Sequence, residues 1–253
     1  MKPVNQLIQQ EGAIQDRSIF WDEDIYQKEM EEIFARCWLF LTHESIIPDE
    51  GDYQATTMGE DSVVVARQKD GSIKAFVNSC THRGNVVCFS DGGNAKSFTC
   101  PYHGWVFGMD GSLVDVPLEK QAYHNEIDKD ALFLKKVRVE SYKGFVFGTF
   151  DEEAPSLEEY LGGMAWYMDS FMDVPGGCEL IGPPMKSILD CNWKNPTENF
   201  IGDGYHVGWA HASALEISGG PLAIAKGNAV YDAETSGLQV TVPEGHGFGV
   251  IWE

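Results

Sequence analysis

The sequence predicts an α+β protein in which a small antiparallel β region lies between two helical regions. Apolar residues recur at helical spacing over residues 22–38 and 156–171, and between these ranges the pattern changes to alternation with a period of two. Asp70-Gly71 and Asp110-Gly111 stand between short β-type runs, as hairpin turns do. With 253 residues, 43% of them hydrophobic, the chain is long enough for two domains.

The first helix is expected to begin at Asp22, whose side chain can cap it, and to end near Trp38. Short β-type runs follow, and the segment 118–134 between them is polar and loop-like. A compact β domain therefore carries the turns that matter for function on its hairpin tips. The expected runs are 38–42, 52–58, 62–67, 73–78, 97–100, 105–108 and 142–150.

Helical spacing returns after the β region. Ser156 can cap a helix that continues to about Phe171, and the Pro-Gly-Gly sequence at 175–177 ends it. A β-type segment is expected around 180–193, followed by a further helix that begins near Pro196.

Two short ligand pairs lie within the β region, Cys80-x-His82 and Cys100-x-x-His103. Two Cys and two His can hold tetrahedral zinc, but they are also the ligands of a Rieske [2Fe–2S] cluster, in which two His replace two Cys on one iron. A zinc finger usually pairs Cys with Cys and His with His, whereas each turn here supplies one of each. The spacing favours the cluster; structural zinc, or four residues meeting by chance in a core, are the alternatives.

A second group of polar residues, Asn199, Asp203, His206 and His211, is expected along one helical segment. Asp203 and His206 are one turn apart and share a face. The two histidines are five residues apart, about 140° around an ideal helix, so binding one ion requires the helix to widen or to end between them. Taken alone, this spacing leaves a structural role equally open. Two His and a carboxylate with open positions form the ligand set of non-haem Fe(II) oxygenases.

Charge and composition exclude several classes of protein. The net charge of −21 argues against nucleic acid as a partner, because phosphates would be repelled. The sequence has no apolar run of about 18 residues and no signal-peptide pattern, so we expect no membrane span and a cytoplasmic protein. Four further cysteines are expected to be free thiols rather than disulfides: Cys37, Cys88, Cys178 and Cys191.

The motif segments resemble the N-terminal part of the large (α) subunit of Rieske non-haem iron ring-hydroxylating dioxygenases. They are CTHRG at 80–84, CPYHGWVFG at 100–108, and NWK, EN, GDGYHVGW and HAS between residues 192 and 213. Within that family the chain is most similar to the naphthalene, biphenyl and polycyclic-aromatic dioxygenases. The resemblance extends from Phe20 to Glu253.

The resemblance implies a small antiparallel β Rieske domain inserted into a catalytic domain of helices over an antiparallel sheet. Residues 1–38 would be an N-terminal arm and helix packing on the catalytic domain, 39–155 the Rieske [2Fe–2S] domain, and 156–253 the first part of the mononuclear-iron domain. The family's third iron ligand is an Asp far downstream, and no acid after His211 stands in a matching motif. We therefore expect a partial sequence that lacks this carboxylate and is inactive alone.

The resemblance also implies roles for individual residues. The two Cys/His pairs would hold the cluster, and His206 and His211 would bind the mononuclear Fe(II). Asp203 would connect this iron site to a cluster histidine of a neighbouring subunit. Three residues would lie near the iron and the substrate: Asn199, Phe200 and Val207.

The reaction implied by the resemblance inserts both atoms of O₂ into an aromatic hydrocarbon, in particular a polycyclic one, as a cis-dihydrodiol. Electrons would come from NAD(P)H through a reductase and a ferredoxin, and the subunits would form an α3β3 or α3 oligomer. A Rieske monooxygenase or demethylase acting on another aromatic substrate is the first alternative. A pure electron carrier is the second, although a carrier would not need the group around His206 and His211.

Overall fold

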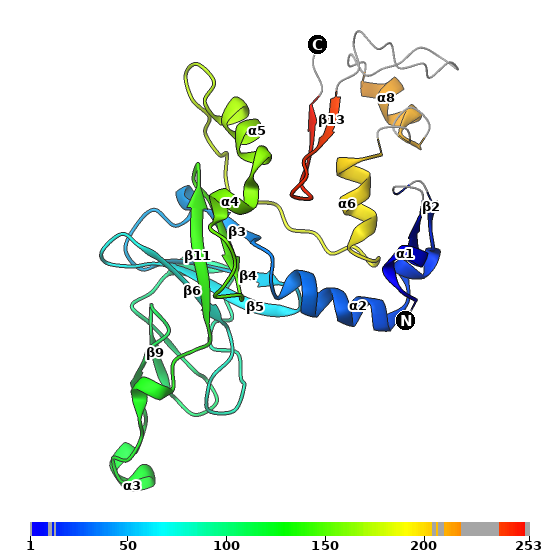
Figure 1. The fold of residues 1–253 in the computed structure, drawn as a ribbon. Helices are drawn as coiled ribbons and strands as arrows, with labels where there is room; N and C mark the ends of the chain where they lie inside the picture. Colours follow the sequence, from blue (N-terminus) through cyan, green and yellow to red (C-terminus); the bar gives the residue numbers. More distant parts are fainter. Residues whose placement is uncertain are drawn as a thin grey trace. The chain divides into compact units, whose positions relative to one another are not determined.

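The computed structural model describes residues 2–9, 12, 14–203, 206, 210–218 and 238–250. The chain divides into two compact units, each assembled from separate segments (Figure 1). The first unit contains Met1–Glu23, Leu161–Asp173 and Ser187–Glu253, and the second contains Asp24–Tyr160 and Val174–Lys186.

The second unit is built on a seven-stranded antiparallel sheet with the strand order β3-β12-β11-β6-β5-β4-β7. The central strands carry runs of consecutive buried residues, because side chains on both faces of the sheet are covered. The strands are β3 (Leu39–His43), β4 (Asp52–Met58), β5 (Asp61–Arg67), β6 (Ile73–Val77), β7 (Gly92–Asn94), β11 (Lys136–Tyr142) and β12 (Phe145–Thr149).

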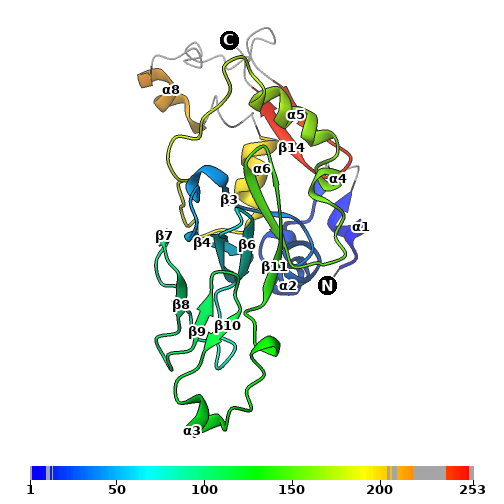
Figure 2. The same ribbon diagram turned by 90° about the vertical axis from the view of Figure 1, so that its left-hand side faces the viewer.

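A smaller antiparallel sheet of three strands has the order β10-β9-β8 (Figure 2). Its strands are β8 (Ser97–Thr99), β9 (Val106–Gly108) and β10 (Leu113–Asp115). The Cys100–His103 pair lies in the loop between β8 and β9, whereas the Cys80–His82 pair follows β6 of the larger sheet. Each ligand pair therefore extends from a different sheet.

Strand β5 separates two hydrophobic cores. Successive side chains of a strand point to opposite faces, so Val64 joins one core while Val63 and Val65 join the other. All three are fully buried. The core on the Val64 side also contains Cys80 and Cys100, so the cysteines anchor their loops in packed apolar surroundings.

Short helices surround the β sheets of the second unit. The predicted first helix is confirmed as α2 followed by a wider π-helical turn, in which Ala35 N donates to Met30 O at 3.0 Å. Ser156 caps α4 as predicted, because Glu159 N donates to its Oγ at 3.2 Å and the Glu159 carboxylate accepts from Ser156 N. The helices are α2 (Glu23–Glu29), η3 (Met30–Phe34), η4 (Glu44–Ile46), α3 (Glu119–Tyr123), η5 (Lys129–Ala131) and α4 (Leu157–Leu161).

In the first unit, helices pack against a β hairpin formed by β13 and β14. The Tyr167 ring of α5 lies 5.7 Å from that of Phe248 in β14. Gly247 approaches Ile201 of α6 so closely that a Cβ would collide with its side chain. The elements are α1 (Val4–Leu7), β1 (Ile8–Gln9), β2 (Ile14–Gln15), η2 (Arg17–Phe20), α5 (Gly163–Met172), α6 (Lys194–Ile201), α8 (Ala212–Ser218), β13 (Leu238–Thr241) and β14 (Gly247–Val250).

Three elements predicted after residue 155 differ from the structure. The helix expected over 156–171 is broken at Gly162, where φ is 48°. The expected strand around 180–193 is absent, since no neighbouring strand pairs with this described segment. The helix expected to carry Asn199 through His211 ends at Ile201.

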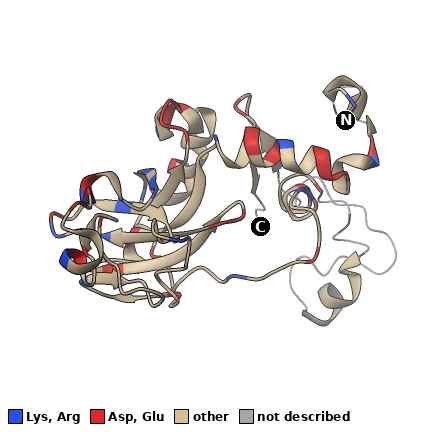
Figure 3. Ribbon diagram, turned by 90° about the horizontal axis from the view of Figure 1, so that it is seen from below, with Lys and Arg blue, Asp and Glu red and all other residues tan. Residues whose placement is uncertain are grey.

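Charge is distributed over the whole described chain. Asp and Glu lie on the helices and on the turns between strands, with Lys and Arg interspersed (Figure 3). Among the described residues, no helix is both long enough and apolar enough to span a bilayer.

Candidate metal centres

The two Cys/His pairs lie in loops that are closed in the same way. Gly84 N donates to Cys80 O at 2.7 Å, and Gly104 N donates to Cys100 O at 2.9 Å. Both glycines have positive φ, 75° and 72°, in the left-handed region that side chains disfavour. Each loop therefore folds into a tight turn, and the glycine that follows the ligands allows the chain to change direction there. The two sequence patterns are C-x-H-x-G and C-x-x-H-G.

The cysteine side of the site is buried. Cys80 and Cys100 are 3% and 1% exposed, and their side chains hydrogen-bond to each other. Each sulfur accepts hydrogen bonds from the backbone N–H groups two and three residues further along the chain. Burial raises the pKa of the Cys80 thiol. Burial is the largest single influence on Cys100 and acts in the same direction, but the backbone and side-chain hydrogen bonds together outweigh it and lower the pKa of Cys100, because they stabilise the thiolate.

The histidine side lies at the surface. The rings of His82 and His103 are 4.6 Å apart, and His82 stacks on Trp105 at 4.7 Å with an interplanar angle of 9°. His103 is exposed and lies 4.1 Å from the ring of Tyr102, itself 60% exposed. Burial, followed by the charges of His103 and Arg83, lowers the pKa of His82 and so favours the neutral ring that binds metals.

The four Cys and His side chains of this site fit an iron–sulfur cluster. Within the part of the chain that the structure describes, His82 Nδ1 is buried and has no hydrogen-bond partner, an arrangement that costs free energy unless a metal or a water satisfies it. No three Cys, His, Asp or Glu side chains of the described residues converge so as to hold one ion. Two cysteines on one side and two histidines on the other suit two irons better than one tetrahedral zinc.

The second candidate centre lies after α6. His206 Nε2 and His211 Nε2 are 3.2 Å apart, with ring centroids at 5.0 Å. Two nitrogens bound at about 2.1 Å to one ion, at roughly a right angle, would lie about 3 Å apart. The structure therefore places close together two histidine nitrogens that an unbroken ideal helix would separate.

Asp203 orients the first of these histidines. His206 Nδ1–H donates to the Asp203 carbonyl at 2.5 Å, which fixes the tautomer that leaves Nε2 free. The Asp203 carboxylate accepts the backbone N–H of His206 at 3.2 Å, and its second oxygen lies 3.4 Å from Nδ1. The expected proximity of Asp203 and His206 is thus present, although helix α6 ends before both residues, at Ile201.

The other predicted pocket residues lie nearby in sequence. Asn199 and Phe200 occupy the last turn of α6, and both are exposed. Val207 lies outside the described residues. Two residues that the sequence did not single out, Trp105 and Asn85, contact the opposite ligand loop. Each directly follows the glycine of its own loop, which is the one signal that could have identified them.

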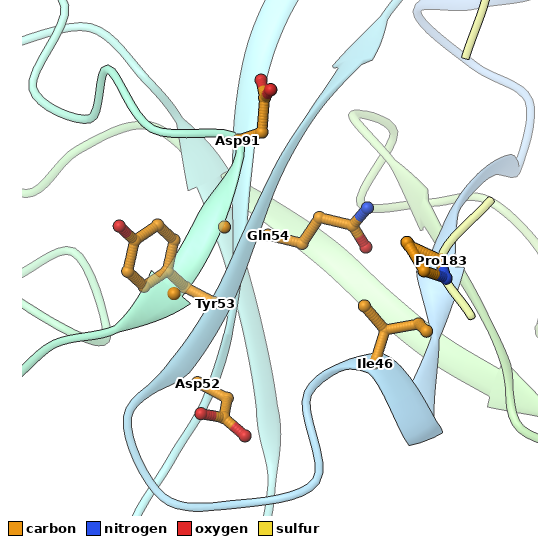
Figure 4. Close-up of a pocket in the computed structure, with 8 residues that line it drawn as sticks. Ile46, Asp52, Tyr53, Gln54, Asp91 and Pro183 are labelled. Carbon is orange, nitrogen blue, oxygen red and sulfur yellow. The ribbon is translucent and has the colours of Figure 1, made fainter. Parts of the chain in front are cut away.

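A hollow of about 340 Å³ in the second unit is separate from these residues. It lies beside β4 and β7, and Asp52, Gln54, Asp91 and Pro183 line it (Figure 4). Asp52 is already engaged by Asn94 Nδ2 at 2.9 Å and Asp49 N at 2.8 Å. The hollow contains none of the predicted ligands.

Two protein families match this chain. The Rieske [2Fe-2S] domain matches residues 37–143, and the ring hydroxylating alpha subunit (catalytic domain) matches residues 157–236. Together with the buried cysteines and paired histidines, the first match defines a Rieske-type iron–sulfur protein. The second match narrows the class. The chain belongs to the Rieske ring-hydroxylating oxygenases and corresponds to the N-terminal part of their large, or α, subunit.

Individual relatives agree with this assignment. The large oxygenase component of a naphthalene 1,2-dioxygenase system of Pseudomonas aeruginosa is 51% identical over 248 residues, covering 98% of this chain and 55% of that protein. The large oxygenase component of a 2,4-dinitrotoluene dioxygenase system of Burkholderia sp. (strain RASC) is 49% identical, covering 96% and 54%. A structure of naphthalene 1,2-dioxygenase with indole in the active site has a TM-score of 0.90 at 50% identity, covering 97% and 55%. The chain thus spans about half the length of these relatives.

Proposed function

We propose that this chain belongs to the terminal oxygenase component of a multi-component dioxygenase that converts an aromatic hydrocarbon, in particular a polycyclic one, to a cis-dihydrodiol. The observation that supports this most directly is the presence of two different metal-binding arrangements in one chain. One is the pair of Cys/His loops, and the other is the pair of histidine nitrogens 3.2 Å apart. The relatives at about 50% identity bear the names of naphthalene and dinitrotoluene dioxygenases.

In this proposal Cys80 and Cys100 hold one iron of the cluster, and His82 and His103 hold the other. The cluster and the mononuclear iron, when bound, supply one-electron transfer and O₂ activation. The backbone donors around the cysteines stabilise the thiolates, and the stack with Trp105 fixes the ring of His82. Because His103 and Tyr102 are exposed, a redox protein such as a ferredoxin, itself served by a reductase, can reach the histidine edge.

At the mononuclear site His206 and His211 are the proposed ligands, and the hydrogen bond that His206 Nδ1–H donates to the Asp203 carbonyl holds His206 in the tautomer needed. No carboxylate of the described residues joins the two histidines. We propose, from the resemblance to the family, that the third ligand is a carboxylate beyond residue 253. Asp203 is proposed to link this site to a cluster histidine of a neighbouring subunit, within an α3β3 or α3 assembly. Phe200 and Val207 are proposed to line the substrate pocket, and Asn199 is proposed as a catalytic residue near the iron and the substrate.

We place the enzyme in the cytoplasm. None of the six cysteines forms a disulfide in the structure, and structural disulfides are rare in that reducing compartment. The proposed electron supply from NAD(P)H is also cytoplasmic.

Metal analysis tests the cluster assignment. Purified anaerobically, the chain should contain about two irons and two labile sulfides attributable to the Rieske site. Cys80→Ser should abolish both the sulfide and the visible absorption. The matched control is Cys88→Ser, because Cys88 is a buried free thiol in the same core but outside both loops. Stoichiometric zinc without sulfide would contradict the proposal.

Product analysis tests the reaction. The assembled enzyme, supplied with ferredoxin, reductase and naphthalene under isotope-labelled O₂, should give a cis-dihydrodiol that carries two labelled oxygen atoms. A single labelled oxygen would indicate the monooxygenase alternative. Electron uptake without any oxygenated product would indicate an electron carrier.

A further inference from the structure

The two ligand loops are equivalent in backbone structure, and in each the residue after the glycine completes the turn. Cys80 N donates to Asn85 O and Cys100 N donates to Trp105 O, both at 2.8 Å. Asn85 and Trp105 therefore occupy the same position in their respective loops. Because of this hydrogen bond, the backbone at this position lies next to the backbone of the cysteine in its own loop.

From this position both side chains reach the opposite loop. Trp105 stacks on His82, as described above. Asn85 Nδ2 lies 3.9 Å from Cys100 Sγ and 2.8 Å from Val86 O. A carboxamide nitrogen carries two N–H groups, so one can donate to the Val86 carbonyl and the other to the sulfur. The hydrogen bond to the Val86 carbonyl holds the amide in the orientation that faces Cys100.

We propose that Asn85 is a positioning residue that donates a hydrogen bond to the Cys100 sulfur and thereby raises the reduction potential of the cluster. The inference rests on the proposed role of Cys100 as a cluster ligand. Reduction adds negative charge to the iron–sulfur unit, and part of that charge is carried by the sulfur ligands. A donor to the sulfur therefore stabilises the reduced form more than the oxidised form.

The donor acts on one of the two cysteines. Both sulfurs receive two backbone N–H groups, but a side-chain amide is added only at Cys100. Because Asn85 is half-buried, water competes only partly for the amide.

The experiment compares the cluster potential of the chain with that of Asn85→Asp and Asn85→Ala, measured by spectroelectrochemistry. The aspartate has nearly the same shape but only accepts, and the alanine removes the amide. The control is Asn94→Ala. The Asn94 amide also connects two segments of this unit, donating to Glu50 O at 2.8 Å and to Asp52 at 2.9 Å, but it contacts no cysteine. Iron and sulfide content, measured first, tests the cluster itself and so separates a failure of the proposed function from a failure of this inference.

We expect both Asn85 variants to retain the cluster and to be harder to reduce. For Asn85→Ala the equilibrium constant for one-electron reduction should fall about three- to tenfold, the upper limit being about 59 mV. For Asn85→Asp this equilibrium constant should fall further, because the variant adds a negative charge next to the cluster. The cluster potential of Asn94→Ala should equal that of the unchanged chain. Equal potentials for the unchanged chain and either Asn85 variant would overturn the proposal. Loss of the cluster in both variants would also overturn it, because Asn85 would then be required for assembly instead of setting the potential.

Discussion

The imidazole of His206 is oriented by the residue three positions before it. The Asp203 carbonyl accepts Nδ1–H, and its carboxylate accepts the backbone N–H of the same histidine. One acidic residue therefore holds both the backbone and the ring of His206 and fixes its tautomer. The sequence predicted this pairing from its spacing on a helix, but the helix ends earlier, at Ile201.

We expect Asp203→Asn to retain iron and to lose activity. The asparagine keeps an acceptor for the His206 N–H and leaves the backbone carbonyl in place, but it removes the negative charge. Loss of an outer partner of a metal-binding histidine typically costs about 10- to 100-fold in activity or affinity. Turnover and iron content of the assembled enzyme are the measurements. Asp190→Asn, a change at an exposed acid outside both centres, should leave both unaltered. Normal turnover by Asp203→Asn would disprove a role for its charge.

The ligand residues were predictable from the sequence, and their neighbours across the fold were not. The pairs Cys80–His82 and Cys100–His103 are visible because ligands of one loop are close in sequence. The stack of Trp105 on His82 joins residues 23 positions apart and depends on how two different sheets place their loops. The assignment of all these residues as ligands stays a prediction until metal content is measured.

Among the elements, the ligand loops depend most on glycine. Gly84 and Gly104 share nearly the same φ, but their surroundings differ. A Cβ at Gly84 would find only Ser79 Oγ at 3.8 Å, whereas a Cβ at Gly104 would lie 2.9 Å from Pro117 Cγ. Both loops therefore need a residue with positive φ at this position, but only at Gly84 is there room for a Cβ.

Alanine substitution should separate the free-energy cost of positive φ from the cost of the steric clash with Pro117. Gly84→Ala should lower the free energy of unfolding of the metal-free chain by about 1–2 kcal/mol, the cost of the left-handed conformation. Gly104→Ala should lower it by a further 1–3 kcal/mol, about the cost of overpacking against Pro117. Gly71→Ala is the control, since it has a φ of 82° with nothing within 4 Å of the added Cβ, and should match Gly84→Ala. Urea unfolding measures all three, and equal effects at Gly84 and Gly104 would contradict the steric argument.

Most strands were predicted where hairpin turns mark them, and the misses have physical causes. The run expected at 142–150 begins instead at Phe145, because Lys143 and Gly144 have positive φ and form the turn between β11 and β12. Strand β7 contains Gly92 and Gly93, which carry no strand signal, and it exists through pairing with β4. The strand expected over 180–193 was wrong, because its apolar residues Ile181 and Ile188 are almost fully exposed and find no partner strand among the described residues.

At the scale of the whole molecule, the main electrostatic feature is the excess of acidic over basic residues. The chain has 39 acidic and 18 basic residues, and the acidic ones lie on helices and turns throughout the described chain (Figure 3). Ion pairs such as Arg138–Glu140, at 2.6 Å, neutralise only a minority of them locally. A net charge of −21 should therefore destabilise the compact state through self-repulsion.

Salt should relieve this repulsion and raise the melting temperature. Increasing NaCl from about 0.01 M to about 0.15 M shortens the Debye length from about 30 Å to about 8 Å. Thermal unfolding followed by circular dichroism measures the change. The double variant Glu152→Gln and Glu153→Gln, in an exposed turn, reduces the net charge from −21 to −19 and should show a smaller increase. A melting temperature that falls with salt would mean that attractive ion pairs outweigh the repulsion.

The position of β5 between the two cores limits how the two ligand loops of the second unit can be reused in protein engineering. Val64 supports the core that holds the cysteines, and Val63 and Val65 support the core on the opposite face. A shift of this strand by one residue would exchange the two faces at once, so neither core can tolerate an insertion within β5. Grafting the two ligand loops onto another scaffold would therefore require transplanting this strand with both of its faces, and not the loops alone.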